Sequence, residues 1–206
     1  MMRFFRAMLC LLGVAACRPG DARPTPIDTT PTAAAAAPIR VVDSVFPMDV
    51  MLDRFRKGLT EPSGLRGLAT SQDDLVQRLI AALTASDTSA FEPMTLDRAE
   101  FAWLYYPTTA SAKPPYELPP ALAWFQLQEK NRKGAFRVLR ELGSHRLGLK
   151  GYRCDPKPTI EGENRIWSGC LVTLSRDGER PVALKLFGAI IERGGRFEIL
   201  SFDNDF

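Results

Sequence analysis

The chain has 206 residues, 45% hydrophobic and 25% charged, so it can bury one proper core but is too short for two full domains. Its formal charge is +3, but the stretch from residue 41 to residue 206 holds 22 basic and 22 acidic residues and is formally neutral. Because no run of lysine and arginine interleaves with aromatic residues, the sequence argues against nucleic-acid binding.

The N-terminal stretch MMRFFRAMLCLLGVAAC begins with Arg3 and Arg6 and continues with an apolar run. That run is too short to span a bilayer as a helix, and the order basic, apolar, small is typical of a secretory signal. The motif VAAC resembles the lipobox of bacterial lipoproteins. The resemblance implies that residues 1–16 are a signal peptide cut before Cys17, and that the Cys17 sulfur carries a diacylglycerol. The alternative is an ordinary secretory cut near GVA.

The same resemblance implies a partner, the membrane that holds the lipid anchor. Arg18, and not an aspartate, follows the cysteine, which by resemblance to enteric lipoproteins indicates the outer membrane, with the protein facing the periplasm. Residues 17–40 are rich in proline, threonine and alanine, which predicts a disordered tether on the order of 25–30 Å long. A single domain is expected at residues 41–206.

Four helices are predicted in the first part of this domain. Apolar spacing places them at residues 48–59, 72–83, 96–106 and 121–142. Ser71 followed by Asp74 is a capping box for the second helix. Thr95 is the expected N-cap of the third helix, which Pro107 ends, and Gly143 is the expected C-cap of the fourth.

The last third of the chain predicts four strands, HRLGLKGYRC, RIWSGCLVTLS, PVALKLFGAII and RFEILSF. The Asp-Gly at 177–178 and the Gly-Gly at 194–195 are two-residue hairpin signals. Symmetric turns there place three pairs opposite each other: Leu171 with Leu184, Phe187 with Phe202, and Ile190 with Ile199. One face of the sheet carries Lys150, Lys185 and Glu198, so we expect the helices to cover the other face.

Helices followed by a four-stranded antiparallel meander predict an α+β domain with its helices packed on a curved sheet. The element order and the ending GRFEILSFDNDF, over residues 71–206, also resemble a cone-shaped superfamily. That superfamily includes nuclear transport factor 2, ketosteroid isomerase and the polyketide cyclases. The resemblance implies a sheet that curls around a pocket, which serves catalysis in some members and only binding or assembly in others.

The common catalytic motifs G-x-S-x-G, H-E-x-x-H, C-x-x-C and the glycine-rich phosphate loop are absent from the sequence. Resemblance to the isomerases suggests an aspartate base, for which Asp203 is the candidate. The predicted register brings neither Arg153 nor the single histidine, His145, within hydrogen-bond reach of it. Two alternatives remain: a pocket enzyme of the isomerase, dehydratase or cyclase type, or a rim carboxylate without a catalytic role. No metal ligands and no cofactor are expected.

Aromatic residues gather on both sides of a proline-rich stretch at residues 107–120. At helical spacing such residues are usually core, and the alternative is that they line an apolar pocket with this stretch as its lip. The candidate lining residues are Trp103, Tyr106, Tyr116, Trp124, Trp167, Arg153 and Asp203. Such a pocket suits a non-catalytic domain that binds an apolar small molecule or an envelope protein.

Two cysteines, Cys154 and Cys170, fall on the first two predicted strands, and Gly162 lies midway between them. A hairpin symmetric about Gly162 sets them directly opposite each other, within the Cα separation that a disulfide accepts. Export to an oxidising compartment favours the bond. The alternative is two buried free thiols.

Overall fold

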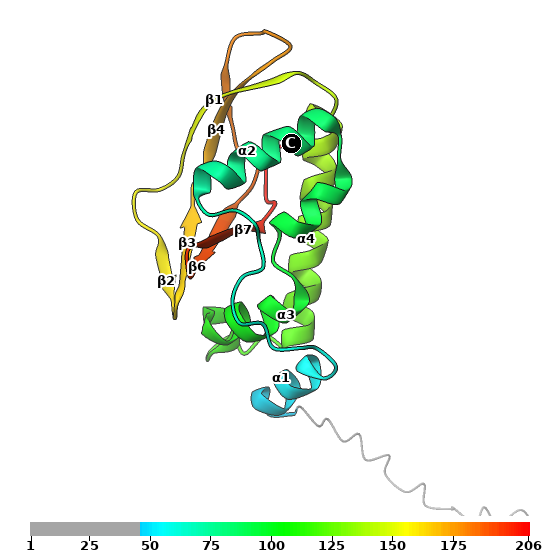
Figure 1. Ribbon diagram of the computed structural model, residues 1–206. Coiled ribbons are helices and arrows are strands. Elements are labelled where there is room, and N and C mark those ends of the chain that lie inside the picture. The colour runs from blue at the N-terminus through cyan, green and yellow to red at the C-terminus, as the bar shows by residue number, and fades with distance from the viewer. Residues whose placement is uncertain (1–45) are drawn as a thin grey trace, which may run out of the picture. The chain divides into compact units, whose positions relative to one another are not determined.

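The computed structural model describes residues 46–206 (Figure 1). The predicted signal peptide, Cys17, the tether and the first residues of the predicted domain lie outside this range. The described chain is an α+β fold in which helices precede antiparallel strands, as the sequence predicted. The helices are α1 (Met48–Arg56), α2 (Gln72–Ala85), α3 (Arg98–Glu100) and α4 (Pro120–Leu142). The strands are β1 (Leu147–Arg153), β2 (Thr159–Glu161), β3 (Asn164–Ser168), β4 (Leu171–Arg176), β5 (Val182–Leu184), β6 (Ala189–Arg193) and β7 (Arg196–Ser201).

The start of α2 confirms the predicted cap. The Ser71 hydroxyl accepts a hydrogen bond from the backbone N–H of Asp74 at 3.0 Å. The Asp74 carboxylate accepts in return from the backbone N–H of Thr70 at 3.2 Å, one residue before the cap. Ser71 is thus the N-cap as predicted, whereas the returning bond of a capping box, to the Ser71 N–H, is replaced here by the bond to Thr70.

The third predicted helix begins and continues differently from the prediction. Its N-cap is Asp97 and not Thr95, because Asp97 and Glu100 form a reciprocal capping box in which each carboxylate accepts from the other residue's backbone N–H. After Glu100 the chain widens into a π-helical turn at Phe101–Tyr105. Thr95 instead closes a short 3₁₀ helix at Thr88–Met94, which was not expected from the sequence.

Helix α4 is the longest helix and packs closely on the C-terminal segment. Gly134, in its middle, faces the backbone of Phe202, and a Cβ at this glycine would lie 1.9 Å from the Phe202 carbonyl oxygen. Asn131 strengthens the same contact, since its side chain donates to the Leu200 carbonyl and accepts from the Phe202 backbone N–H. The internal glycine therefore marks a close approach of helix and strand.

The predicted four-stranded meander is bent into two sheets. One sheet has the strand order β1-β4-β5 and the other β2-β3-β6-β7. Two of the four predicted strands are interrupted, one between β3 and β4 and the other between β5 and β6, and the first predicted strand, β1, is followed after a gap by β2. Each of these segments thus leaves one sheet and enters the other, and β2 is a strand within a segment that was predicted to be a loop.

The registers differ from the prediction at one hairpin. The Asp177-Gly178 turn forms, with both residues at positive φ, but Val172 and not Leu171 faces Leu184. Pro181 precedes β5 and has no backbone N–H, and pairing resumes one residue later than a symmetric turn requires. At the Gly-Gly hairpin the pair of Ile190 with Ile199 is confirmed, whereas Phe187 lies before β6 and outside the strands.

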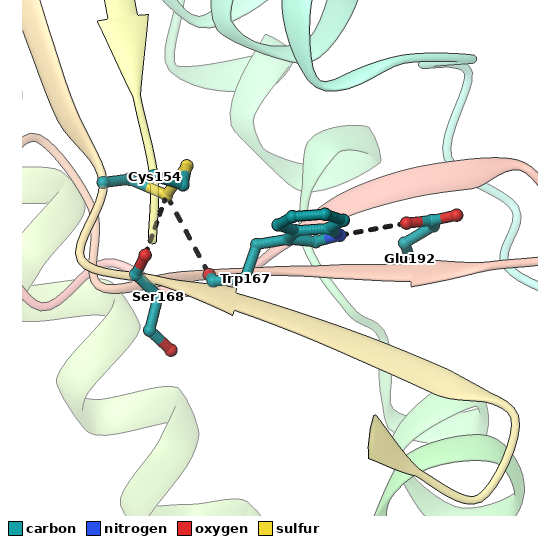
Figure 2. The surroundings of a disulfide bond; sticks show 5 residues. Cys154, Trp167, Ser168 and Glu192 are labelled. Atoms are coloured by element: carbon teal, nitrogen blue, oxygen red, sulfur yellow. Dashed lines mark hydrogen bonds between the residues drawn. A yellow bond between two sulfur atoms is a disulfide. The ribbon is translucent and has the colours of Figure 1, made fainter. Parts of the chain in front are cut away.

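The disulfide between Cys154 and Cys170 is present, with the two Cα atoms 3.9 Å apart. Arg153 pairs with Leu171 at the end of the β1–β4 ladder, so the two cysteines occupy the next position of the same register. The bond lies where the meander passes from one sheet to the other. Figure 2 shows it beside the backbone of Trp167 and Ser168, at the end of β3.

Two hydrophobic cores hold the domain together. The first joins α2 and the end of α4 to β4, β6 and β7, and includes Leu79, Val138 and Ile190. The second joins α1 and the residues around α3 to β3, β6 and β7, with Phe101 at its centre. In Figure 1, α2 crosses the strands while α4 runs along one side of the domain. Glu198, on the face that was predicted to be more polar, is fully buried.

Candidate functional site

Most of the aromatic residues beside the proline-rich stretch belong to the second core. The Phe101 ring lies 5.8 Å from Phe55, 5.5 Å from Tyr106 and 5.1 Å from Trp124, measured between ring centroids. Tyr106 is buried, and its hydroxyl donates to the Leu118 carbonyl oxygen, which ties the proline-rich stretch to the core. These contacts favour the core interpretation for Tyr106 and Trp124.

The other predicted lining residues are dispersed. The Arg56 guanidinium stacks on the half-buried Trp103 with 5.0 Å between charge and ring centre, while Tyr116 and Arg153 are exposed. Trp167 lies beside the disulfide and donates through its indole N–H to Glu192 at 2.9 Å (Figure 2). Among five of the pockets formed by residues 46–206, one is lined by Trp124 and none by the other six candidates. The structure does not bring the seven residues together around one cavity.

Asp203 lies on the surface in an ion pair. Its carboxylate accepts from the Lys185 ammonium at 2.7 Å, and this hydrogen bond holds the pKa of Asp203 below its usual range. A carboxylate stabilised in this way is a weaker base than a free one. His145 pairs instead with Asp177 at 2.7 Å, at the turn after β4. Asp203 and His145 therefore lie in two separate ion pairs on the surface.

A pair of buried carboxyl groups, not predicted from the sequence, lies between α3 and β7. Glu100 and Glu198 are both fully buried and lie close enough for the charge of Glu100 to shift the pKa of Glu198. Two backbone N–H groups of the segment before α2 donate hydrogen bonds to this pair. The Arg66 N–H donates to Glu100 Oε1, and the Gly67 N–H donates to Glu198 Oε1 at 2.6 Å. Glu198 Oε2 has no N–H donor.

Burial controls the ionisation of this pair. Together with the charge of Glu100 beside it, burial raises the pKa of Glu198 to about 8, and burial also raises the pKa of Glu100. Two neighbouring buried carboxylates cannot both ionise without a large free-energy cost, so the raised pKa of Glu198 favours its neutral, protonated form near neutral pH. Arg66 balances the remaining charge, with its Nε 3.8 Å from Glu100 and 3.1 Å from Asp97.

The carboxyl pair is sealed from solvent. Gly67 packs directly on it, since a Cβ at this glycine would lie 2.5 Å from Glu198 Cγ. None of the five pockets is lined by Glu100 or Glu198. The arrangement stores a proton and joins three segments of the chain, but it offers no surface to a substrate.

A second pair of side chains with raised pKa values, Tyr105 and Glu161, lies beside the proline-rich stretch. Burial and the nearby Glu161 charge raise the pKa of Tyr105 to about 12, so this phenol stays protonated and neutral. Burial also raises the pKa of Glu161, against the opposing charge of Lys113. A neutral, hard-to-ionise phenol beside a carboxyl is a poor nucleophile and a poor base.

The outer face of α4, in contrast, presents apolar side chains to solvent. Phe125 and Phe136 are 60% and 64% exposed, and Leu122 is 43% exposed. The opposite side of the helix carries the buried Gly134 and Val138. Exposed apolar side chains gathered on one element are typical of an interaction surface.

Among residues 46–206 no three His, Cys, Asp or Glu side chains form a group that could hold a metal ion. In the same range, no helix combines the length and the apolar character that a membrane crossing requires. Comparison with the models of known protein families, with curated proteins and with solved structures finds no match.

Proposed function

We propose that this chain is a lipid-anchored protein of the bacterial cell envelope whose folded domain binds a partner and does not catalyse. The observation that carries the binding role is the outer face of α4, where Leu122, Phe125 and Phe136 face solvent. The perturbed carboxyl groups at Glu100 and Glu198 are closed off inside the fold, which supports a structural role for them.

The anchor is proposed from the sequence. The lipobox-like VAAC after a basic and apolar start supports acylation of Cys17, and Arg18 supports the outer membrane as the destination. Several acyl chains on one cysteine hold a protein to a bilayer far longer than a single chain does. The likeness to the cone-shaped superfamily, some of whose members bind without catalysing, is proposed from the element order and the ending GRFEILSFDNDF of the sequence.

The enzyme alternative rests on Asp203 and has weaker support. A catalytic base needs to reach a substrate proton with a pKa matched to its task. Asp203 is held in its ionised form by Lys185, and none of the five pockets of the described domain is lined by it. The binding function therefore accounts for more of the geometry.

Substitution of Cys17 tests the anchor. We expect the wild-type chain, expressed with its N-terminus intact in a bacterial host, to lose residues 1–16, gain acyl mass and partition into detergent. Cys17→Ser removes the acceptor sulfur and should stay uncut at that site and unacylated, while Cys10→Ser, inside the predicted signal, should behave as wild type. Intact-mass measurement distinguishes the cut and acylated chain from the uncut and unacylated one. Wild-type protein with an unmodified Cys17, free in the periplasmic fraction, would overturn the proposal.

A further inference from the structure

We propose that the outer face of α4 lies on an anionic phospholipid surface. This inference rests on the proposed function, because the lipid anchor at Cys17 would keep the domain beside a membrane. It identifies the partner as the lipid surface itself, and it assigns the contact to residues of α4 for which the fold provides no partner.

Helix geometry brings the exposed apolar side chains onto one line. At 3.6 residues per turn, Leu122, Phe125 and Phe136 fall within an arc of about 60° on the helix. Gly134 and Val138, which are buried, point to the opposite side. Phe125 and Phe136 lie about 16 Å apart along the axis at 1.5 Å per residue. Side chains aligned on one arc of a helix can enter the same flat bilayer surface together.

The charge on α4 is complementary to anionic lipid. The helix carries five basic and two acidic side chains, a formal charge of +3. Arg132, Lys133 and Arg140 lie on or beside the arc of the apolar row. Glu129, on the same arc, pairs with Arg132 at 3.0 Å and with Lys133 at 3.5 Å, and Glu141 pairs with Arg140 at 2.7 Å. These three basic and two acidic side chains together keep one net positive charge, to which Lys130 and Arg137 of the same helix add.

The same charge disfavours a second copy of the chain as the occupant. Two α4 faces brought together would place like charges against each other, which opposes association. An anionic lipid surface instead gains attraction from each basic side chain near it. Apolar side chains flanked by basic ones are the composition of helices that lie in a membrane interface. A surface contact of this kind adds a second membrane signal to the acyl chains.

Vesicle binding without the anchor tests this contact. The mature chain starting at residue 17 and carrying Cys17→Ser is mixed with phosphatidylcholine vesicles, with and without phosphatidylglycerol, and sedimented. We expect it to bind the phosphatidylglycerol vesicles and to be released by salt. Phe125→Ser with Phe136→Ser should weaken binding about tenfold or more, because two apolar contacts are lost. Ile160→Ser, at an equally exposed site on β2, should leave binding unchanged.

The contribution of charge to vesicle binding can be tested separately from that of the apolar side chains. Arg140→Gln should reduce binding to the anionic vesicles about fivefold, whereas Arg180→Gln, in the loop between β4 and β5, should not. Thermal unfolding of each variant confirms that it is folded, which is expected because the substituted side chains are exposed.

Absence of binding to phosphatidylglycerol vesicles would overturn the inference, as would equal binding by the wild-type chain and the double phenylalanine variant. Concentration-dependent dimerisation that the double variant abolishes would assign the face to a second copy and would also overturn it. The test is independent of acylation. Failure here with an acylated Cys17 removes only the docking surface, while an unmodified Cys17 removes the proposed anchor whatever the vesicles show.

Discussion

The region between α3 and β7 and the outer face of α4 reverse the usual distribution of polar and apolar side chains. Inside, Glu100 and Glu198 are fully buried, whereas outside, Phe125 and Phe136 are more than half exposed. A buried polar group and an exposed apolar cluster are the informative departures from an ordinary fold. The first is compensated within the domain by backbone donors and a proton, so it is structural. The second has no such compensation within residues 46–206, which points to a partner.

The comparison is sharpest for two phenylalanines of opposite exposure. Phe101→Ala should cost about 3–5 kcal/mol of unfolding free energy, since this ring is buried and contacts Tyr106 and Trp124. Phe125→Ala should change it by no more than about 0.5 kcal/mol, because the ring is mostly exposed. Urea titration measures both. Similar losses at the two positions would show that the α4 face is covered within the domain.

A smaller effect is expected from crowding the carboxyl pair. Gly67→Ala places a Cβ 2.5 Å from Glu198 Cγ and should cost about 1–3 kcal/mol, because Glu198 or the segment before α2 must shift. Gly64→Ala is the control, since a Cβ at this glycine would meet no atom within 4 Å. The difference between the two variants, again from urea titration, isolates the contact. Equal unfolding free energies would contradict close packing of Gly67 on the pair.

The smallest effect is expected at Asp203. Asp203→Asn removes a surface ion pair with Lys185 and should change the unfolding free energy by no more than about 0.5 kcal/mol. Since Lys185 lowers the pKa of Asp203, the wild-type pair stabilises above the ordinary aspartate range and loses this contribution as pH falls through the folded pKa. Stabilisation by several kcal/mol in the variant would instead reveal a buried, unpaired charge and would favour the enzyme alternative.

Local features of the fold were predictable from the sequence, because they depend on neighbouring residues. The Ser71 cap, the Gly-Gly hairpin and the disulfide each follow from spacing along the chain. The bend of the meander was not predictable, because the two interrupted predicted strands, RIWSGCLVTLS and PVALKLFGAII, are each apolar on both sides of the break. The shift before β5 depends on how the chain leaves the Asp177-Gly178 turn, which the turn residues do not determine.

The carboxyl pair was missed because its members are distant in sequence and come together only when α3 packs beside β7. The one local sign was Glu198 itself, an acidic residue between Phe197 and Ile199 in an apolar strand. Alternation along the strand grouped it with two lysines and so indicated an exposed face. The exposure of Phe125 was equally hidden, since helical spacing favoured a core position and α4 carries apolar residues on both of its faces.

Unfolding free energy measured from about pH 5 to pH 9 tests most directly whether the buried region is held by a stored proton. The folded state keeps a proton that an unfolded glutamate, with a pKa near 4.5, releases, so stability should be highest at low pH and fall until about pH 8. The slope should approach about 1.4 kcal/mol per pH unit for one proton. Glu198→Gln keeps a neutral group at every pH. It should therefore flatten the profile and exceed the wild-type stability at pH 9, while Asp203→Asn should follow the wild-type slope. Parallel profiles for the wild-type chain and Glu198→Gln would contradict the shared proton.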